Sequence, residues 1–245
     1  MASPPPTRRF APLSKGKGHD AIDGDMVLKG IVFDVDGTLC EPQNHMFGTM
    51  REKLGITKEQ DILDHVYSLS GSKQKEAHKI IEDVEREAMA EQVPQAGLAT
   101  LMEHLDKNDI KKGICTRNFN APVDHLLSNH LPSHIDAFAP IVTRDFRPPK
   151  PSPAGILHIA KQWKIIGESD VGDDGRPIAK RSIPMIMVGD SIDDIIAGHD
   201  AGCATVLLRS EGKEDLEKDP RTDVVISRLD ELVDILEKGF ESRQK

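Results

Sequence analysis

Ile31-Val32-Phe33-Asp34-Val35-Asp36-Gly37-Thr38-Leu39 is the stretch that decides the fold of this 245-residue sequence. Its apolar start predicts a buried strand that runs into two acids spaced i, i+2 and then a Gly-Thr break. Aspartate is depleted in strands, so sheet stability does not account for these two carboxylates. Open α/β sheets bind ligands at the carboxyl edge of their strands, and we therefore expect Asp34 and Asp36 to lie at a ligand site. A strand end with two solvated turn aspartates is the alternative, since Asp-Gly also marks ordinary turns.

Apolar runs and amphipathic stretches alternate along the chain from Lys29 onward. Helical spacing is clear where Leu98, Leu101, Met102 and Leu105 follow i, i+3, i+4, i+7. This alternation predicts an α/β fold with a Rossmann-like three-layer core, in which helices cover both faces of a mostly parallel sheet. The expected strands are 30–34, 110–115, 138–142, 185–188 and 204–208, with an edge strand at 224–226.

Residues 41–93 interrupt this alternation, because they contain no expected strand. Three amphipathic helices are predicted there instead, and the insertion directly follows the first strand. We expect a small α-helical cap beside Asp34, with the core formed by 27–40 and 94–245. A polar insert at 167–181 is expected to be an exposed loop. The apolar faces of the three cap helices are Met46, Phe47, Met50 and Leu54; Ile62, Leu63, Val66 and Tyr67; and Ala77, Ile81, Val84 and Ala88.

Residues 1–26 are rich in Pro, Gly, Ser and basic residues and lack an apolar period, so they are expected to form a disordered tail. Within them residues 1–18 carry four basic residues and no acid, whereas the whole chain has a net charge of −9. That balance argues against a nucleic-acid binder that neutralises phosphates. The acid-free start leaves a mitochondrial address open as an alternative to a cytoplasmic location.

The three cysteines, Cys40, Cys115 and Cys203, are far apart and give no disulfide framework, which indicates a reducing compartment. No apolar run approaches the roughly 18 residues that a membrane span needs. We therefore expect a soluble cytoplasmic protein that binds neither membranes nor nucleic acid. The oligomeric state is not predicted.

Three further polar positions follow expected strands or loops in order along the chain. Thr116 follows the strand at 110–115, Lys150 lies in the proline-rich loop Arg147-Pro148-Pro149-Lys150-Pro151, and Asp190 follows the strand at 185–188. Thr116 and Lys150 each have an ordinary alternative, a β-branched strand end and a solvated loop lysine. Compensation of a helix dipole is the alternative for Asp193 and Asp194, but it explains Asp190 poorly, because Asp190 should precede the helix at the strand tip.

Taken together, these positions predict a phosphate site that also holds a cation. If Asp34, Asp36 and Asp190 meet at one edge, two charges about 4 Å apart repel by roughly 4 kcal/mol at an effective dielectric of 20. Mg²⁺ suits such a set of oxygen ligands and also accepts a phosphate oxygen. Thr116 and Lys150 would then face the phosphoryl group on the other side.

The order D-V-D-G-T-L, then Thr, then Lys-Pro, then G-D-S-x-x-D resembles the haloacid dehalogenase superfamily over about residues 27–235. The helical insert after the first strand is similar to one cap type of that family. Residues 114–118 and 143–153 look closest to little-characterised fungal and plant members related to phosphoglycolate-phosphatase-like proteins. The insert at 167–181 departs from the compact members.

The resemblance implies a role for each matching position. Asp34 would be the nucleophile that forms an aspartyl-phosphate, and Asp36 would act as general acid and then base. Asp34, the backbone carbonyl of Asp36, and Asp190 would hold Mg²⁺, with Asp194 in an outer position. Thr116 and Lys150 would stabilise the phosphoryl oxygens, with Arg117 beside them as a third expected phosphate-binding residue.

We accordingly expect a Mg²⁺-dependent phosphatase acting on a small phosphorylated metabolite. Asp36 favours a phosphatase over a dehalogenase, because a leaving alkoxide needs a proton and a halide does not. A phosphomutase of the same superfamily and a non-catalytic binding protein with the same fold remain alternatives. Candidate contacts to a substrate carboxylate or second phosphate are Asn118, Arg144 and Arg147 near the site, and in the cap His45, Arg51, Lys53, His65, Lys73, Lys75, His78 and Lys79.

Overall fold

The computed structural model describes residues 8–13, 23–172, 174–179 and 181–242. Six parallel strands form one sheet in the order β4-β3-β2-β5-β6-β7, which confirms the predicted α/β fold. Non-consecutive neighbours in this order mean that helical crossovers link the strands, as parallel pairing requires. The strands are β2 (Gly30–Phe33), β3 (Lys111–Cys115), β4 (Ile141–Val142), β5 (Met185–Gly189), β6 (Ala204–Leu208) and β7 (Val224–Ile226).

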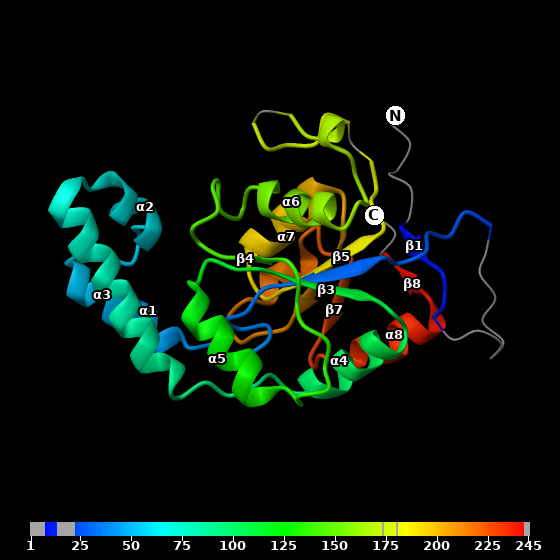
Figure 1. Ribbon diagram of the computed structural model, residues 1–245, viewed down its shortest axis with the longest axis horizontal. Coiled ribbons are helices and arrows are strands. Elements are labelled where there is room, and N and C mark those ends of the chain that lie inside the picture. The colour runs from blue at the N-terminus through cyan, green and yellow to red at the C-terminus, as the bar shows by residue number, and fades with distance from the viewer. Residues whose placement is uncertain (1–7, 14–22, 173, 180, 243–245) are drawn as a thin grey trace.

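Helices cover both faces of the sheet (Figure 1). One face packs on α4 (Leu98–Lys107), α5 (Asn120–His130) and α8 (Glu231–Lys238), and the other on α6 (Ala154–Gln162) and α7 (Ile192–Ala201). Successive residues of a strand point to opposite faces. Accordingly Ile31 and Phe33 of β2 join the first of these two apolar clusters, and Val32 joins the second. Because both faces are covered, β2 is apolar and buried along its whole length.

The register of the sheet brings the polar strand ends together. Phe33 of β2 lies level with Ile114 of β3 on one side and Val188 of β5 on the other. The Asp34 amide donates to the Val188 carbonyl at 3.0 Å, which extends the ladder by one residue. The residues that follow these three strands therefore emerge side by side at the carboxyl edge.

Strand β4 is shorter than predicted: it comprises Ile141 and Val142, although 138–142 was expected to be extended. Before it, the Ala139 amide donates to the Lys112 carbonyl of β3 at 2.9 Å. Pro140 has no N–H to donate, and only its carbonyl contributes, accepting from the Ile114 amide at 3.1 Å. Phe138 is buried for another reason, since it packs edge-on against Phe33 with ring centroids 6.0 Å apart.

The three helices predicted between residues 41 and 93 are present and share an apolar cluster of their own. They are α1 (Asn44–Leu54), α2 (Ile62–Ser68) and α3 (Gly71–Met89). Cys40 and Pro94 pair in a β-bridge where the chain leaves and re-enters the core. Figure 1 shows these helices to one side of the sheet, and we refer to α1–α3 as the cap.

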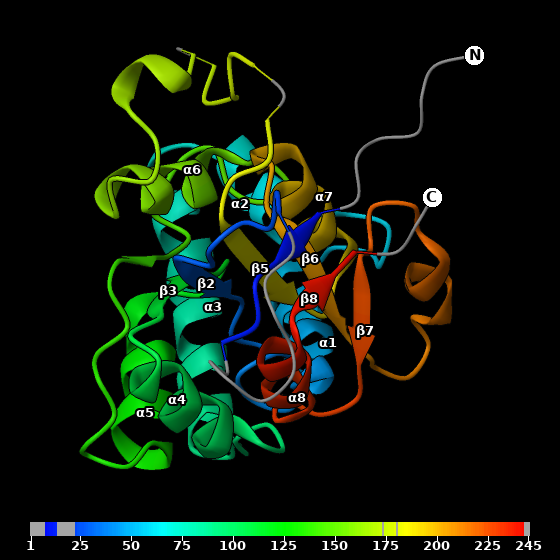
Figure 2. The same cartoon turned by 90° about the vertical axis from the view of Figure 1, so that its right-hand side faces the viewer.

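The expectation of a disordered tail over residues 1–26 is wrong for part of it. Strand β1 (Arg9–Phe10) pairs antiparallel with β8 (Phe240–Glu241), and the two strands lie side by side in Figure 2. Phe10 is 2 % exposed and contacts Phe240 with ring centroids 5.5 Å apart. A single aromatic residue in a polar stretch gives no local period, and its partner comes from the other end of the chain. Residues 1–7 and 14–22 lie outside the described residues.

The described residues of the insert at 167–181 stand away from the sheet, above α6 in Figure 2. It contains the short 3₁₀ helix η1 (Glu168–Asp170) and one bridge, Val171 to Pro177. A second 3₁₀ helix, η2 (Glu214–Lys218), follows β6. Within the described ranges, no helix combines the length and apolar character that crossing a membrane requires.

Candidate active site

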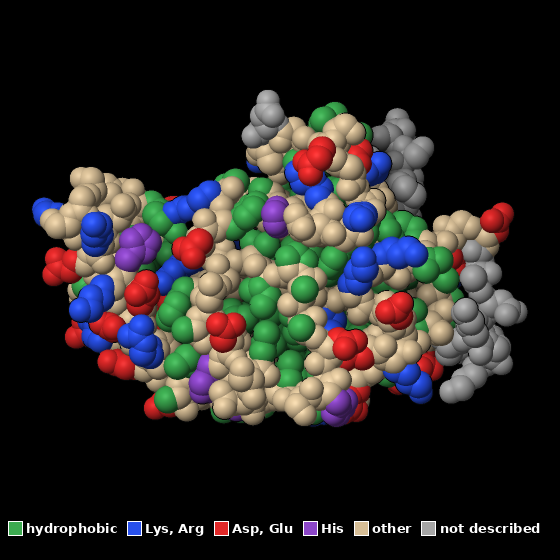
Figure 3. Space-filling model, viewed as in Figure 1, with side chains coloured by type: hydrophobic (Ala, Val, Ile, Leu, Met, Phe, Trp, Pro, Cys, Tyr) green, Lys and Arg blue, Asp and Glu red, His purple; other side chains and the backbone are tan. Residues whose placement is uncertain are grey.

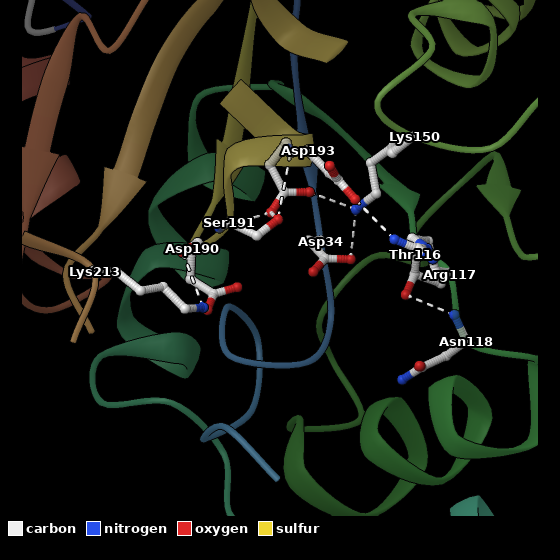
Figure 4. Close-up of polar contacts among 10 residues, drawn as sticks. Asp34, Thr116, Arg117, Asn118, Lys150, Asp190, Ser191, Asp193 and Lys213 are labelled. Carbon is white, nitrogen blue, oxygen red and sulfur yellow. Dashed lines mark hydrogen bonds and ion pairs between the residues drawn. The ribbon is translucent and has the colours of Figure 1, made fainter. Parts of the chain in front are cut away.

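A cavity of about 290 Å³ lies between the carboxyl edge of the sheet and the cap. Its polar floor comes from the core, and its cap wall is largely apolar. Figure 4 shows Asp34, Thr116 and Asp190 at strand ends and Lys150 on a loop, all directed toward one another. The floor includes Asp34, Asp36, Thr116, Lys150 and Asp190, and the cap wall includes Phe47, Met50, Ile62, Leu63 and Ile81.

Lys150 connects two buried aspartates at the centre of the floor. Its ammonium lies 2.7 Å from Asp34 Oδ1 and 2.5 Å from Asp194 Oδ1, and only 3 % of its side chain is exposed. Burial by itself would lower the pKa of Lys150, but the ion pairs with Asp194 and Asp34 outweigh it and raise that pKa. Lys150 is therefore a fixed positive charge next to the Asp34 carboxylate.

Asp194 owes its place partly to the local structure of α7. Ser191 caps this helix, and its main-chain N–H donates to Asp194 Oδ2 at 3.0 Å in a capping box. The other oxygen of Asp194 accepts from Lys150. One oxygen of Asp194 thus stabilises the N-terminus of α7, as the helix-dipole explanation predicted. The other oxygen binds Lys150 in the site, which that explanation does not account for.

Asp190 is the third buried acid of the floor, and its carboxylate pairs with Lys213. Lys213 also donates to the main-chain carbonyl of Asp190 at 3.2 Å. Burial raises the pKa of Asp190, and repulsion by Asp194 adds to the shift. Lys213 was missed in the sequence. It comes shortly after β6, the strand next to β5 in the sheet, so the strand order would have placed it near Asp190.

The residues present fit a hard divalent cation. Asp34, Asp190 and Asp194 are buried, and each offers a carboxylate oxygen within 4.8 Å of the others. When all are ionised, these three acids and Asp36 carry four negative charges, against two positive charges on the lysines that pair with them, so two negative charges remain uncompensated. All-oxygen donors and an excess of two negative charges match Mg²⁺. The carboxylate of Asp36 is not among the three clustered groups.

The two acids of the deciding motif have raised pKa values. Burial raises the pKa of Asp34 to about 7, against the opposing attraction of Lys150. Burial also raises the pKa of Asp36 to about 6, and the Gln43 amide at the start of the cap holds its Oδ1 at 3.2 Å. A carboxyl group with a pKa near neutrality can both donate and accept a proton.

Thr116 and Arg117 both line the cavity but differ in how they are engaged. Thr116 Oγ1 accepts from the Asn118 amide at 3.2 Å, so its own hydroxyl proton stays available for donation to a group in the cavity. Both terminal nitrogens of Arg117 are taken up, one by Asp193 at 2.8 Å and the other by Asp61 at 2.6 Å. Because Asp61 caps α2, Arg117 connects the core to the cap. Its predicted role as a phosphate ligand stays a prediction.

Two more arginines of the core contact the cap. Arg144 Nη1 lies 2.9 Å from Oε2 of Glu85 on α3, and both side chains are almost fully buried. Burial raises the pKa of Glu85 to about 7, although Arg144 acts in the opposite direction. The guanidinium of Arg147 lies over the ring of Tyr67 in α2, 3.0 Å from its centroid. These arginines therefore hold the cap against the core.

Residues 28–202 match the family described as haloacid dehalogenase-like hydrolase, which is more than half of the chain. The chain belongs to the haloacid dehalogenase-like hydrolases. An uncharacterised hydrolase of Saccharomyces cerevisiae, YOR131C, is 44 % identical over 220 residues, or 88 % of this chain and 94 % of the relative. A haloacid dehalogenase-like hydrolase domain-containing protein of Arabidopsis thaliana, At2g33255, is 33 % identical over 229 residues, covering 87 % of this chain and 86 % of the relative.

The fold of this haloacid dehalogenase-like hydrolase is also that of solved structures. CbbY from Rhodobacter sphaeroides in complex with phosphate superimposes with a TM-score of 0.60 at 19 % identity, covering 84 % of this chain and 96 % of CbbY. The predicted family and fold are therefore confirmed, and the chain is a hydrolase of this superfamily.

Sequence reasoning missed Glu85 and Asp61 in the cap of this hydrolase. Glu85 is one of many acids on α3, and Asp61 reads as an ordinary cap of α2, so only the fold shows that arginines from the core reach them. Of the basic residues proposed in the cap, Arg51 alone lines the cavity. His65 and His78 are half-buried, and the others are exposed: His45, Lys53, Lys73, Lys75 and Lys79.

Proposed function

We propose that this hydrolase is a Mg²⁺-dependent phosphatase that hydrolyses a small phosphomonoester through an aspartyl-phosphate on Asp34. The position of the Asp34 carboxylate carries the proposal. It lies on the cavity floor, 2.7 Å from Lys150 and beside two further buried acids. The fold shared with CbbY, which was solved with phosphate, supports a phosphate ligand.

In the first step, a carboxylate oxygen of Asp34 attacks phosphorus and the bond from phosphorus to the alcohol oxygen breaks. The carboxyl group of Asp36 gives its proton to the departing alcohol. In the second step, water attacks the phosphorus of the aspartyl-phosphate and Asp36 takes a proton from that water. Phosphate leaves, and both aspartates return to their starting states.

Positive charge around the phosphoryl oxygens is the main aid to this chemistry. Lys150 is held beside Asp34 by its ion pairs, and the Thr116 hydroxyl faces the same cavity. Asp34, the main-chain carbonyl of Asp36, and Asp190 would hold Mg²⁺, with Asp194 farther out. The bound Mg²⁺ would neutralise charge on the phosphoryl oxygens.

Asp36 favours phosphate-ester hydrolysis over dehalogenation. Its pKa of about 6 allows the carboxyl group to be protonated in one step and ionised in the next at near-neutral pH. A leaving halide would have no use for that proton. The arrangement therefore fits an alkoxide leaving group.

The test is phosphate release from a panel of esters with and without Mg²⁺. The panel contains p-nitrophenyl phosphate, phosphoglycolate, sugar phosphates and pyridoxal phosphate. We expect turnover that stops in excess chelator and falls on the order of 10³-fold or more in Asp34→Asn. Asp124→Asn, which alters an exposed acid of α5, is the matched control and should retain wild-type rates. Turnover that persists in Asp34→Asn, or that is equal in chelator, would overturn the proposal.

A further inference from the structure

We infer that Arg51 binds a second anionic group of the substrate, so that the phosphomonoester carries a carboxylate or another phosphate besides the one released. The inference rests on the proposed function and specifies its substrate class. Around the cavity, Arg51 differs from the other described cations because it has no acidic partner.

Among the described cations that line the cavity, each one except Arg51 pairs with a carboxylate. Lys150 lies against Asp34, and Lys213 against Asp190. Arg117 bonds two acids with its two terminal nitrogens. These three cations balance charges of the protein itself.

The guanidinium of Arg51 lacks such a partner among the described residues. Its Nε is buried and forms no hydrogen bond there, while Nη1 reaches only the Phe47 carbonyl of the same helix at 3.4 Å. The hydrogen bond with Thr57 is the main cause that lowers the pKa of Glu59, and the charge of Arg51 adds to this shift. Glu59 is exposed and forms no ion pair with Arg51 among the described residues. Arg51 also lies in the last turn of α1, where a basic residue compensates the helix dipole. Dipole compensation does not require a buried, unbonded Nε in a cavity wall.

The acids on the cap side of the cavity do not compete for this position. Asp61 is bonded to Arg117 and Glu85 to Arg144. On the cap side of the cavity, an anion therefore meets acids that arginines already bind. Arg51 remains available to it.

The surroundings of Arg51 strengthen its attraction for an anion. Phe47 and Met50 of α1 and Ile81 of α3 form the apolar wall beside it. Low polarity strengthens a charge interaction, and the planar guanidinium can bond two oxygens of a carboxylate or phosphate at once. With the phosphoryl group at Asp34 on the floor, a short carbon chain along this wall would carry the second anion to Arg51.

The other basic residues of the cap do not offer this combination. Figure 3 shows Lys and Arg side chains interspersed with Asp and Glu over the surface of the cap, at the left of the view. Lys53, on the same helix as Arg51, has a side chain that is 43 % exposed and lies 3.7 Å from Glu87. Lys53 is therefore the matched control.

Pairs of esters that differ only in the remote group test the inference. One series compares carboxyalkyl phosphates, beginning with phosphoglycolate, with their amides; the other compares alkanediol bisphosphates with the monophosphates. We expect the wild type to prefer one anionic series by about tenfold or more in kcat/KM, mainly through KM. In Arg51→Met that preference should fall to about twofold or less, whereas Arg51→Lys keeps part of it. Lys53→Met should retain the full preference.

Binding to the Asp34→Asn protein, measured by calorimetry, makes the test independent of turnover. The anionic ester should bind at least about tenfold more tightly than its neutral partner, and the added Arg51→Met substitution should remove the difference. Equal binding and equal kcat/KM for both members of each pair would overturn the inference, as would a preference that survives in Arg51→Met. If p-nitrophenyl phosphate is hydrolysed but the anionic esters are not preferred over their neutral partners, the role of Arg51 is refuted and the proposed function stands. If no ester is hydrolysed, the proposed function falls, and the binding comparison still decides the role of Arg51.

Discussion

Replacing Lys150 by methionine removes the cation between two buried acids and should destabilise the core strongly. Asp34 is 12 % exposed and Asp194 is fully buried, and each lies within 2.7 Å of the ammonium. Without Lys150, two ionised carboxylates whose oxygens are no more than 4.8 Å apart repel by at least about 3.5 kcal/mol at an effective dielectric of 20. Removing one partner of a buried ion pair typically costs about 3–5 kcal/mol, which agrees with this figure. We expect the free energy of unfolding to fall by that amount near neutral pH without added metal.

The loss should depend on pH with a definite sign. Burial already raises the pKa of Asp34 to about 7, and removing Lys150 raises it further. An acid whose pKa is higher in the folded than in the unfolded state destabilises the fold above its unfolded pKa, and stability falls as the pH rises through that window. The difference between Lys150→Met and wild type should therefore shrink as the pH is lowered from about 7.5 to about 5.

Urea unfolding followed by circular dichroism at both pH values measures these losses. Lys161→Met is the control, because Lys161 pairs with a Glu168 carboxylate that is 86 % exposed. Breaking such a surface pair should cost about 1 kcal/mol or less. A loss in Lys150→Met no larger than that of the control, or one that grows toward acidic pH, would refute the reasoning.

Three other perturbations test the remaining parts of the site. Gly37 has a φ of +81°, and a Cβ built there lies 2.5 Å from Asp190 Oδ2, so Gly37→Ala should lower both phosphate release and Mg²⁺ affinity by about tenfold or more, measured by turnover and calorimetry. Arg144→Met leaves Glu85 buried without its partner and should cost about 3–5 kcal/mol in urea unfolding. Arg86→Gln breaks only an exposed pair on the same helix and should cost less than about 1 kcal/mol; equal losses in the two variants would contradict the buried pairing. Mg²⁺ at 100 times its dissociation constant should stabilise the protein by about 2.7 kcal/mol in thermal unfolding, and Ca²⁺ should bind yet inhibit phosphate release; no stabilisation by Mg²⁺ would contradict the metal site.

Local patterns were sufficient for the core of the fold. The run that ends at Phe33 is a strand because it is short and apolar on both faces, and α4 is a helix because Leu98, Leu101 and Leu105 recur at helical spacing. The same logic fails where the partner is distant. Phe10 is buried against Phe240, which comes from the other end of the chain. The strand expected at 138–142 is shorter for a local reason, because Pro140 interrupts it and hydrophobic periodicity does not register this effect.

In the candidate site too, some residues could be placed from the sequence and others only from the fold. Asp34, Thr116 and Asp190 could be placed from the sequence, because the parallel strands that precede them must end at one edge of the sheet. Lys213 and Glu85 could not, since nothing local distinguishes a functional charge from a solvated one on a polar loop or helix face. Their partners became visible only when strand order and cap position were known.

By itself, the amino-acid sequence determined which elements form and which strand ends carry acids, a hydroxyl and a lysine. These are consequences of side-chain period and of the chemistry of neighbouring residues, both of which are local. Only the tertiary structure decided how the charges pair: Arg117 with the cap, Lys213 with Asp190, and Arg51 with no acid among the described residues. Pairing depends on distances between segments that are remote in the chain. Those distances follow from packing, and the order of residues along the chain does not contain them.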